Sequence, residues 1–179
     1  MHGTEAPSGW IVRWSHRVPA AGRVLDVACG AGRHMQWFAG RGHPVLGVDC
    51  HNEALDRAGA FGPTLLADLE HAPWPLPGQT FDAVVVTNYL WRPLWPHVLE
   101  SIAAGGVLLY ETFARGQETV GRPSRPEFLL EQGELLRVTR SLRTVAFEEG
   151  FESSTPRFVQ RIAAVREHDG AEAVRWSLA

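Results

Sequence analysis

The segment Gly30-Ala31-Gly32 has the clearest potential for binding chemistry in this chain. It follows an apolar run at 23–28, which predicts a buried parallel strand, and it precedes a helical segment at 33–40. Glycine lets the backbone approach a ligand closely, and a helix N-terminus offers free N–H groups and partial positive charge. A glycine loop between a strand and a helix therefore predicts a nucleotide-like ligand.

Two acids and a missing glycine narrow the choice of nucleotide. Asp26 lies inside the predicted strand, where it would repel a pyrophosphate but suits a cationic amino-acid group. Met35 occupies the position of the third glycine of the dinucleotide fingerprint. Asp49 ends the next strand, where a carboxylate can accept hydrogen bonds from two ribose hydroxyls. The pattern disfavours a dinucleotide and indicates a nucleoside that carries an amino-acid group.

The elements that position these residues alternate between strand and helix. Apolar runs that predict strands are 23–28, 45–48, 64–67, 81–87 and 107–112, and helical patterns cover 10–14, 33–40, 52–60 and 94–104. Two further strands, 142–149 and 158–166, follow without an intervening helix and predict an antiparallel hairpin. We therefore expect an α/β fold with a mostly parallel sheet and one antiparallel edge strand.

Ligands of such sheets bind where the strands end at their carboxyl termini. That rule selects Cys29–Gly32, Asp49, Asp68, Asn88 and Glu111. The stretch 113–133 is too long for an ordinary connection, so it is either a lid over the strand ends or a disordered loop. Its side chains suited to a lid are Phe113, Arg115, Arg122, Arg125 and Phe128.

The composition excludes several classes of protein. At 179 residues the chain fits a single domain, and its formal net charge of -3 gives no overall basic field for nucleic acid. Two cysteines are too few for a disulfide scaffold, and no apolar run reaches the ~18 residues of a membrane span. We see no signal peptide at the N-terminus. We therefore expect a cytoplasmic protein, either a monomer or a homodimer, with no metal, no membrane association and no nucleic-acid partner.

The run Asp26-Val27-Ala28-Cys29-Gly30-Ala31-Gly32-Arg33-His34 resembles the first motif of the class I methyltransferases that use S-adenosylmethionine (SAM). The resemblance covers roughly residues 20–167. It implies a Rossmann-like, three-layer αβα fold with a seven-stranded sheet, SAM as cofactor and S-adenosylhomocysteine (SAH) as product.

The same resemblance assigns roles to individual positions. Asp26 and the loop Gly30–Gly32 would hold the methionine part, and Asp49 would bind the ribose hydroxyls. Asp68 and Leu69 would meet the adenine, and Asn88 would lie beside the transferable methyl group. The other positions expected to contact the cofactor are Ala28, Cys29, Arg33, His34 and Cys50.

The second half of the chain is similar to a group of small bacterial methyltransferases of the tellurite-resistance type. The similarity is carried by 88–93, 110–113, 121–123 and 128–130. We expect a small-molecule acceptor. Asn88-Tyr89-Leu90 departs from the Asn-Pro-Pro-Tyr pattern of amino-directed nucleic-acid methyltransferases, which argues against adenine-N6 or glutamine-N5 methylation.

Methyl transfer is an in-line displacement at an activated carbon, so positioning and desolvation supply most of the rate. A soft nucleophile such as a thiol or a chalcogen compound needs no base, whereas a protonated oxygen or nitrogen acceptor needs one. We take Asn88, Tyr89 and Glu111 as catalytic candidates, with Glu111 either a base or a structural residue. Candidates for binding the substrate are Arg92, Phe113 and Arg115. A SAM-binding partner module without catalysis and an RNA or protein methyltransferase remain the alternatives.

Overall fold

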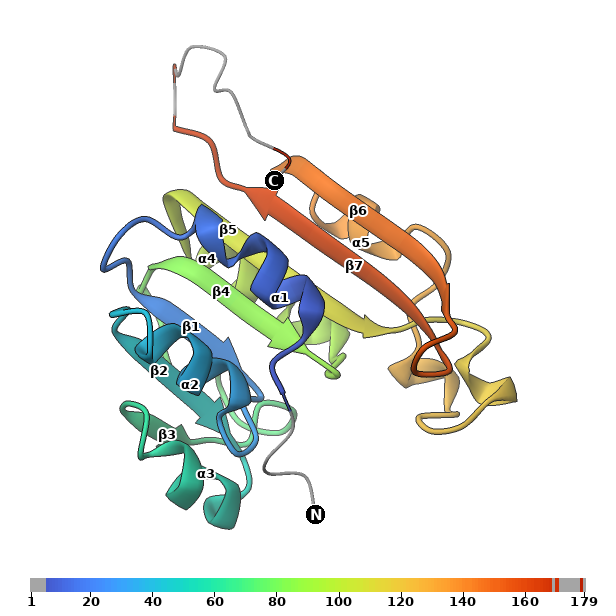
Figure 1. Ribbon diagram of the computed structural model, residues 1–179, viewed down its shortest axis with the longest axis horizontal. Helices are drawn as coiled ribbons and strands as arrows, with labels where there is room; N and C mark the ends of the chain where they lie inside the picture. Colours follow the sequence, from blue (N-terminus) through green and yellow to red (C-terminus); the bar gives the residue numbers. More distant parts are fainter. Residues whose placement is uncertain (1–5, 169, 171–177, 179) are drawn as a thin grey trace.

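A single mixed sheet of seven strands organises the computed structural model, which describes residues 6–168, 170 and 178 (Figure 1). Its strand order is β3-β2-β1-β4-β5-β7-β6. The strands are β1 (Val24–Val27), β2 (Val45–Asp49), β3 (Thr64–Leu66), β4 (Phe81–Thr87), β5 (Ile102–Phe113), β6 (Arg143–Glu152) and β7 (Arg157–Val165). The first five are parallel, and β7 is antiparallel to both of its neighbours. The predicted parallel sheet with a closing hairpin is confirmed.

Helices cover both faces of the sheet and give three layers (Figure 1). One face packs against α1 (Gly9–Trp14), α2 (Arg33–Ala39) and α3 (Asn52–Ala58). The opposite face packs against α4 (Trp95–Glu100) and α5 (Glu134–Val138). Because both faces are buried, central strands such as β1 are apolar on both sides, with Asp26 as the exception.

The predicted helix 94–104 was wrong in its last four residues. The helix α4 ends at Glu100, and β5 begins at Ile102, which pairs with Phe81 of β4. The pairing is interrupted before Val107, where Gly105 has a φ of 80°. Periodicity cannot tell a short apolar run in a strand from one in a helix, and here the Ile102 side chain completes the core of the sheet.

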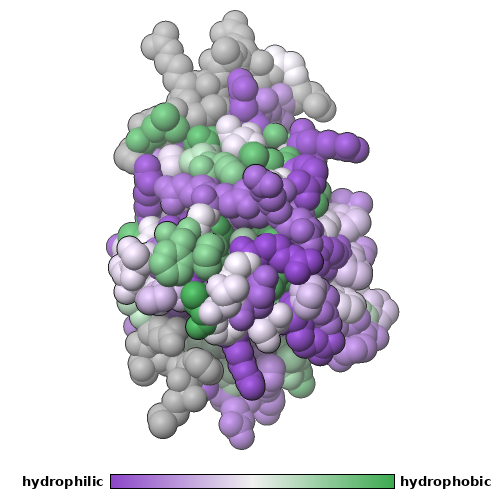
Figure 2. Space-filling view, turned by 90° about the vertical axis from the view of Figure 1, so that its right-hand side faces the viewer, coloured by the Kyte–Doolittle hydropathy of each residue, from purple (hydrophilic) through white to green (hydrophobic). Residues whose placement is uncertain are grey.

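The segment 113–133 is ordered through two short 3-10 turns, at Gln117–Thr119 and Pro126–Phe128. A β-bridge joins Ala114 to Leu130 and closes the segment on itself. The segment leaves the carboxyl end of β5 and lies beside the tip of the β6–β7 hairpin (Figure 1). Hydrophilic side chains cover much of this side of the molecule, with smaller hydrophobic areas between them (Figure 2).

Two further expectations concern the N-terminal helix and membrane spans. Residues 1–5 lie outside the described residues, and α1 matches the expected helix at 10–14 closely. Within the part of the chain that the structure describes, no helix is long and apolar enough to cross a membrane.

Candidate functional site

The glycine loop after β1 places one glycine against open space and another against a helix. Gly30 has a φ of 54°, and a Cβ built on it would meet nothing within 4 Å. Gly32 has a φ of 82°, and its Cβ would lie 2.9 Å from the Cβ of Ala58 in α3. Gly30 therefore leaves room for a ligand, whereas Gly32 is required so that α2 and α3 can pack.

Asp49 links the end of β2 to this loop. Its Oδ2 accepts a hydrogen bond from the Gly30 backbone N–H at 2.8 Å, and its Oδ1 accepts one from the His51 N–H at 2.9 Å. The residue is 7% exposed. The carboxylate stands at the edge of the loop, where it can accept further hydrogen bonds from a ligand.

Asp26 lies in the middle of β1, between Gly47 of β2 and Val85 of β4. It is 1% exposed, and its Oδ2 has no hydrogen-bond partner among the described residues. Burial raises the pKa of its carboxyl group to about 7. A buried carboxyl with an unused oxygen is rare, and it suits a ligand that brings a donor or a positive charge.

Two cavities meet around Asp49. The first has a volume of about 470 Å³, and the loop 28–31 and residues of the β4 end, Thr87 to Tyr89, line it. The second has a volume of about 390 Å³ and lies along Cys50 and the loop 67–71. Both cavities are lined by Ala28, Asp49, His51 and Tyr89. Together they form one elongated space over the carboxyl ends of β1 to β4.

Most of the expected cofactor contacts line this space, whereas Asp26, Gly32 and His34 line neither cavity. Cys29, Gly30 and Arg33 line the first cavity, and Cys50, Asp68 and Leu69 line the second. Asp68 is exposed, and its Oδ1 accepts the backbone N–H groups of Glu70 and His71 at 2.9 and 3.1 Å. These hydrogen bonds lower the pKa of Asp68 and form a turn. Asp68 thus makes a turn and also borders the cavity.

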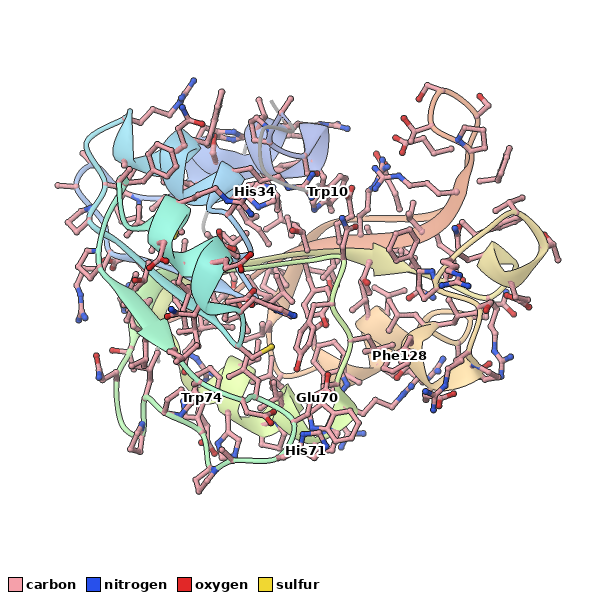
Figure 3. All side chains as sticks on the ribbon, turned by 90° about the horizontal axis from the view of Figure 1, so that it is seen from below. Trp10, His34, Glu70, His71, Trp74 and Phe128 are labelled. Carbon is pink, nitrogen blue, oxygen red and sulfur yellow. The ribbon has the colours of Figure 1, made fainter. Side chains whose placement is uncertain are left out.

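His34 lies behind the loop. Its side chain is buried, and its Nε2 accepts the backbone N–H of Ser8 at 3.1 Å (Figure 3). Burial lowers the pKa of His34 to about 3, so the ring is neutral at physiological pH. These contacts give His34 a positional role that joins α2 to the segment before α1.

Asn88 and Tyr89 follow β4 and border the first cavity. Asn88 has a φ of 54° and is exposed, while its backbone N–H donates to the carbonyl of Glu111 at 2.9 Å. The Tyr89 hydroxyl is buried without a hydrogen-bond partner among the described residues. Both residues therefore border the cavity, Asn88 with an exposed side chain and Tyr89 with its hydroxyl buried.

Glu111 occupies a different environment. It is 1% exposed and forms ion pairs with Nε of Arg161 at 2.6 Å and with Arg157 at 3.4 Å. Its Oε1 also accepts a hydrogen bond from the Ser8 hydroxyl at 3.0 Å. Two guanidinium groups and a hydroxyl engage the carboxylate, so the contacts favour a structural role over that of a general base.

Two of the expected substrate residues are engaged in holding the segment 113–133. Arg92 makes a two-pronged ion pair with Glu134, at 2.7 and 2.8 Å, and donates to the carbonyls of Glu127 and Leu129. Arg115 pairs with Glu131 at 2.8 Å. Phe113, in contrast, lines a cavity of about 190 Å³ beside Asn88 and Tyr89.

Sequence reasoning missed Glu70 and Ser8. Glu70 lines both the second cavity and the 190 Å³ cavity, and it follows Asp68 in a loop whose direction the sequence does not reveal. Its position in the loop that follows β3, four residues after Leu66, was the one available signal. Ser8 bridges His34 and Glu111, far apart in sequence, and no local pattern indicates such a contact.

Comparisons with known proteins agree with this architecture. Residues 24–105 match the family described as a methyltransferase domain. TehB from Haemophilus influenzae has a similar structure, with a TM-score of 0.73 and 18% identity over 92% of this chain. This chain covers only 64% of that protein, less than two thirds of its length.

Two other solved structures cover the chain to a similar extent. A TehB-like SAM-dependent methyltransferase from Corynebacterium glutamicum has a TM-score of 0.67 and 19% identity, covering 92% of this chain and 90% of that one. The N-methyltransferase NodS from Bradyrhizobium japonicum has a TM-score of 0.67 and 16% identity, with 88% and 94% covered. A search of curated proteins gave no significant match. At these identities the structures establish the fold.

Proposed function

From the premise that this chain has the fold of the SAM-dependent methyltransferases and carries a methyltransferase domain over residues 24–105, we propose that it transfers a methyl group from SAM to a small-molecule acceptor. The family match implies SAM as the cofactor. When bound, SAM supplies a methyl group already activated by a positively charged sulfur. The protein then has to bind the cofactor and the acceptor, orient them, and exclude water from the site.

The observation that carries the proposal is the meeting of the two cavities at Asp49, beside the open face of Gly30. A nucleoside with an amino-acid tail needs such an elongated site with a turn at the ribose. The second cavity, with Leu69 and Asp68, would take the adenine, and Asp49 would accept the ribose hydroxyls. The first cavity would take the methionine part.

The unpartnered carboxyl of Asp26 supports the same orientation. A cationic amino group near the Gly30 loop would favour its ionised form, which burial otherwise disfavours. Asn88 and Tyr89, which follow β4, also line the first cavity, and we assign them to the reacting end. Asn88 would position the methyl group, and Tyr89 would form part of the wall beside it.

Soft nucleophiles, such as a thiol or a chalcogen compound, are among the acceptors to be tested, because they need no general base. Calorimetric titration with SAM and SAH is the first experiment, and we expect binding of both. A labelled-methyl screen that includes thiols, selenite and tellurite follows. A folded sample that binds neither SAM nor SAH would refute the proposal. Tight SAM binding without turnover would instead indicate the non-catalytic module, and methylated RNA or protein would redirect it to a macromolecular acceptor.

A further inference from the structure

A small cavity beside the proposed methyl site has an unusual combination of walls. Its volume is about 190 Å³, below the ~300 Å³ at which drug-sized pockets begin. Asn88 and Tyr89 line both this cavity and the 470 Å³ cavity, so the two spaces adjoin at the end of β4. A molecule in the small cavity would therefore be compact and would face the methyl group.

Aromatic rings form much of the lining. Tyr89 follows β4, Phe113 ends β5, and Phe128 comes from the 3-10 turn of the segment 113–133. All three are partly buried. The negative faces of aromatic rings attract cations placed within ~6 Å of the ring centre. Such walls accept an apolar molecule and stabilise one that carries a positive charge.

Glu70 adds a negative charge at the same place. Figure 3 shows Glu70 and Phe128 approaching the same region, from the loop after β3 and from the segment 113–133. The Glu70 side chain is half-buried, and no ion pair to its carboxylate is found among the described residues. Burial, and secondarily the charge of Glu70, raise the pKa of the Tyr89 hydroxyl.

Three nearby arginines are paired with acids. Arg92 pairs with Glu134, Arg115 with Glu131 and Arg125 with Glu127, and the Arg125 guanidinium also lies 5.2 Å from the centre of the Phe128 ring. None of these arginines is among the residues that line the small cavity. The cavity is therefore unfavourable for an anion, whether a thiolate, selenite or tellurite, because Glu70 would repel it.

We propose that this cavity binds a compact, uncharged nitrogen nucleophile of the pyridine type, and that Glu70 and the three aromatic rings stabilise the positive charge that the nitrogen gains on methylation. This inference rests on the proposed function. The nitrogen lone pair forms the new N–C bond while the C–S bond breaks, and the electrons of that bond stay on sulfur. The positive charge thus moves from the sulfur to the nitrogen, and no proton is transferred.

A reaction without proton transfer agrees with the side chains near the small cavity. Glu111 is held by two arginines, and neutral His34 is bonded to Ser8 behind the loop. Neither residue lines the small cavity. An acceptor that becomes a cation without losing a proton needs neither of them as a base. It needs a site that stabilises the charge as it arrives.

The test compares two molecules of equal shape and different charge. N-methylpyridinium and toluene are titrated into the 179-residue chain saturated with SAH, by calorimetry or by NMR. We expect the cation to bind about tenfold more tightly than toluene. Glu70→Gln should remove most of that preference and Glu70→Asp should retain it. Phe128→Leu should weaken cation binding severalfold. Glu53→Gln, at an exposed acid in α3, is the control and should leave the preference unchanged.

SAH affinity is measured for every variant, so a loss of cation binding is separated from a loss of the fold or of the cofactor site. Equal affinity for N-methylpyridinium and toluene would overturn the inference, as would an unchanged preference in Glu70→Gln. With SAM and pyridine, we expect N-methylpyridinium by mass spectrometry. Methylation of thiols or selenite alone would overturn this inference and leave the proposed function standing. Failure to bind SAM would remove both.

Discussion

The Asp49 carboxylate accepts a hydrogen bond from the backbone N–H of Gly30 at 2.8 Å, and this bond holds the end of β2 against the glycine loop after β1. Under the proposed function, the same carboxylate binds the ribose. The bond orients the carboxylate before the ligand arrives, so little ordering is needed on binding.

Replacement of Asp49 by alanine should therefore weaken SAM binding strongly. Loss of hydrogen bonds from two hydroxyls to a charged acceptor amounts to about 2–4 kcal/mol, which is a fall in affinity of about 30- to 1,000-fold. Calorimetric titration with SAH measures it. Asp56→Ala, at an exposed acid in α3, is the matched control and should bind normally. Unchanged affinity in Asp49→Ala would exclude the ribose role.

The two glycines of the loop should respond differently to alanine. In Gly32→Ala the new Cβ meets Ala58 at 2.9 Å in a left-handed backbone, so we expect a loss of about 2–4 kcal/mol in the free energy of unfolding. In Gly30→Ala the Cβ enters open space, so only about 1 kcal/mol of backbone strain is expected.

The affinity for SAM should also differ between the Gly30→Ala and Gly32→Ala variants. The Gly30→Ala methyl group projects into the ligand space, and the folded variant should bind SAM at least about tenfold more weakly. Urea denaturation and SAH titration on both variants provide the comparison. Equal stability of the two variants would contradict the packing role of Gly32.

Two buried groups give opposing pH dependence to the fold. Asp26 has a pKa of about 7 in the folded chain against an ordinary 3.8, so between these values the folded state holds the extra proton. The free energy of unfolding then falls as pH rises, by about 1.4 kcal/mol per pH unit. His34 has a pKa of about 3 against an ordinary 6.5, so the unfolded state holds the extra proton between them and stability rises with pH.

Between about pH 4 and 6.5 these slopes oppose each other in the native chain. Asp26→Asn removes the falling slope, so its stability should rise with pH across this window more steeply than that of the native protein. Urea denaturation at pH 4.5, 5.5 and 6.5 measures the slopes. Identical slopes in Asp26→Asn and the native chain would show that Asp26 titrates near its ordinary pKa.

SAM binding should depend on the same carboxyl. A cationic amino group favours ionised Asp26, so SAM affinity should increase between pH 6 and 8, by up to about tenfold per unit below the pKa. In Asp26→Asn the affinity should be lower and nearly independent of pH. A pH dependence that survives the substitution would assign it to another group.

The ion pair of Arg92 with Glu134 should hold the segment 113–133 in place. Glu134 has a side chain only 9% exposed, and removal of Arg92 leaves its charge without this partner. Arg92→Ala should therefore cost about 2–4 kcal/mol of stability, and proteolysis within 113–133 should become faster. Arg115→Ala breaks an exposed pair with Glu131 and should cost less than about 1 kcal/mol. Equal effects of the two substitutions would contradict the assignment.

The sequence alone predicted the sheet, and it predicted which residues of the proposed donor side lie at the strand ends. The positions of Asp26–Arg33, Asp49 and Asp68 at or near the ends of successive strands follow from rules that act over short stretches of the chain. Strand alternation decides which face a residue takes, and the carboxyl ends of parallel strands must meet at one edge. Because these relations depend on residues close together in the chain, the sequence pattern is enough to predict them.

The tertiary structure decided which charged residues surround the proposed acceptor cavity. Arg92 and Glu111 occur where strands or turns suggest a site, yet Arg92 is bound by Glu134 and Glu111 by Arg157 and Arg161. Whether a charged side chain faces a ligand or a partner depends on which distant segment packs beside it. Glu70 has no such partner among the described residues and borders the small cavity. Local sequence records the type of each residue, whereas only the packed chain sets which charges are already neutralised.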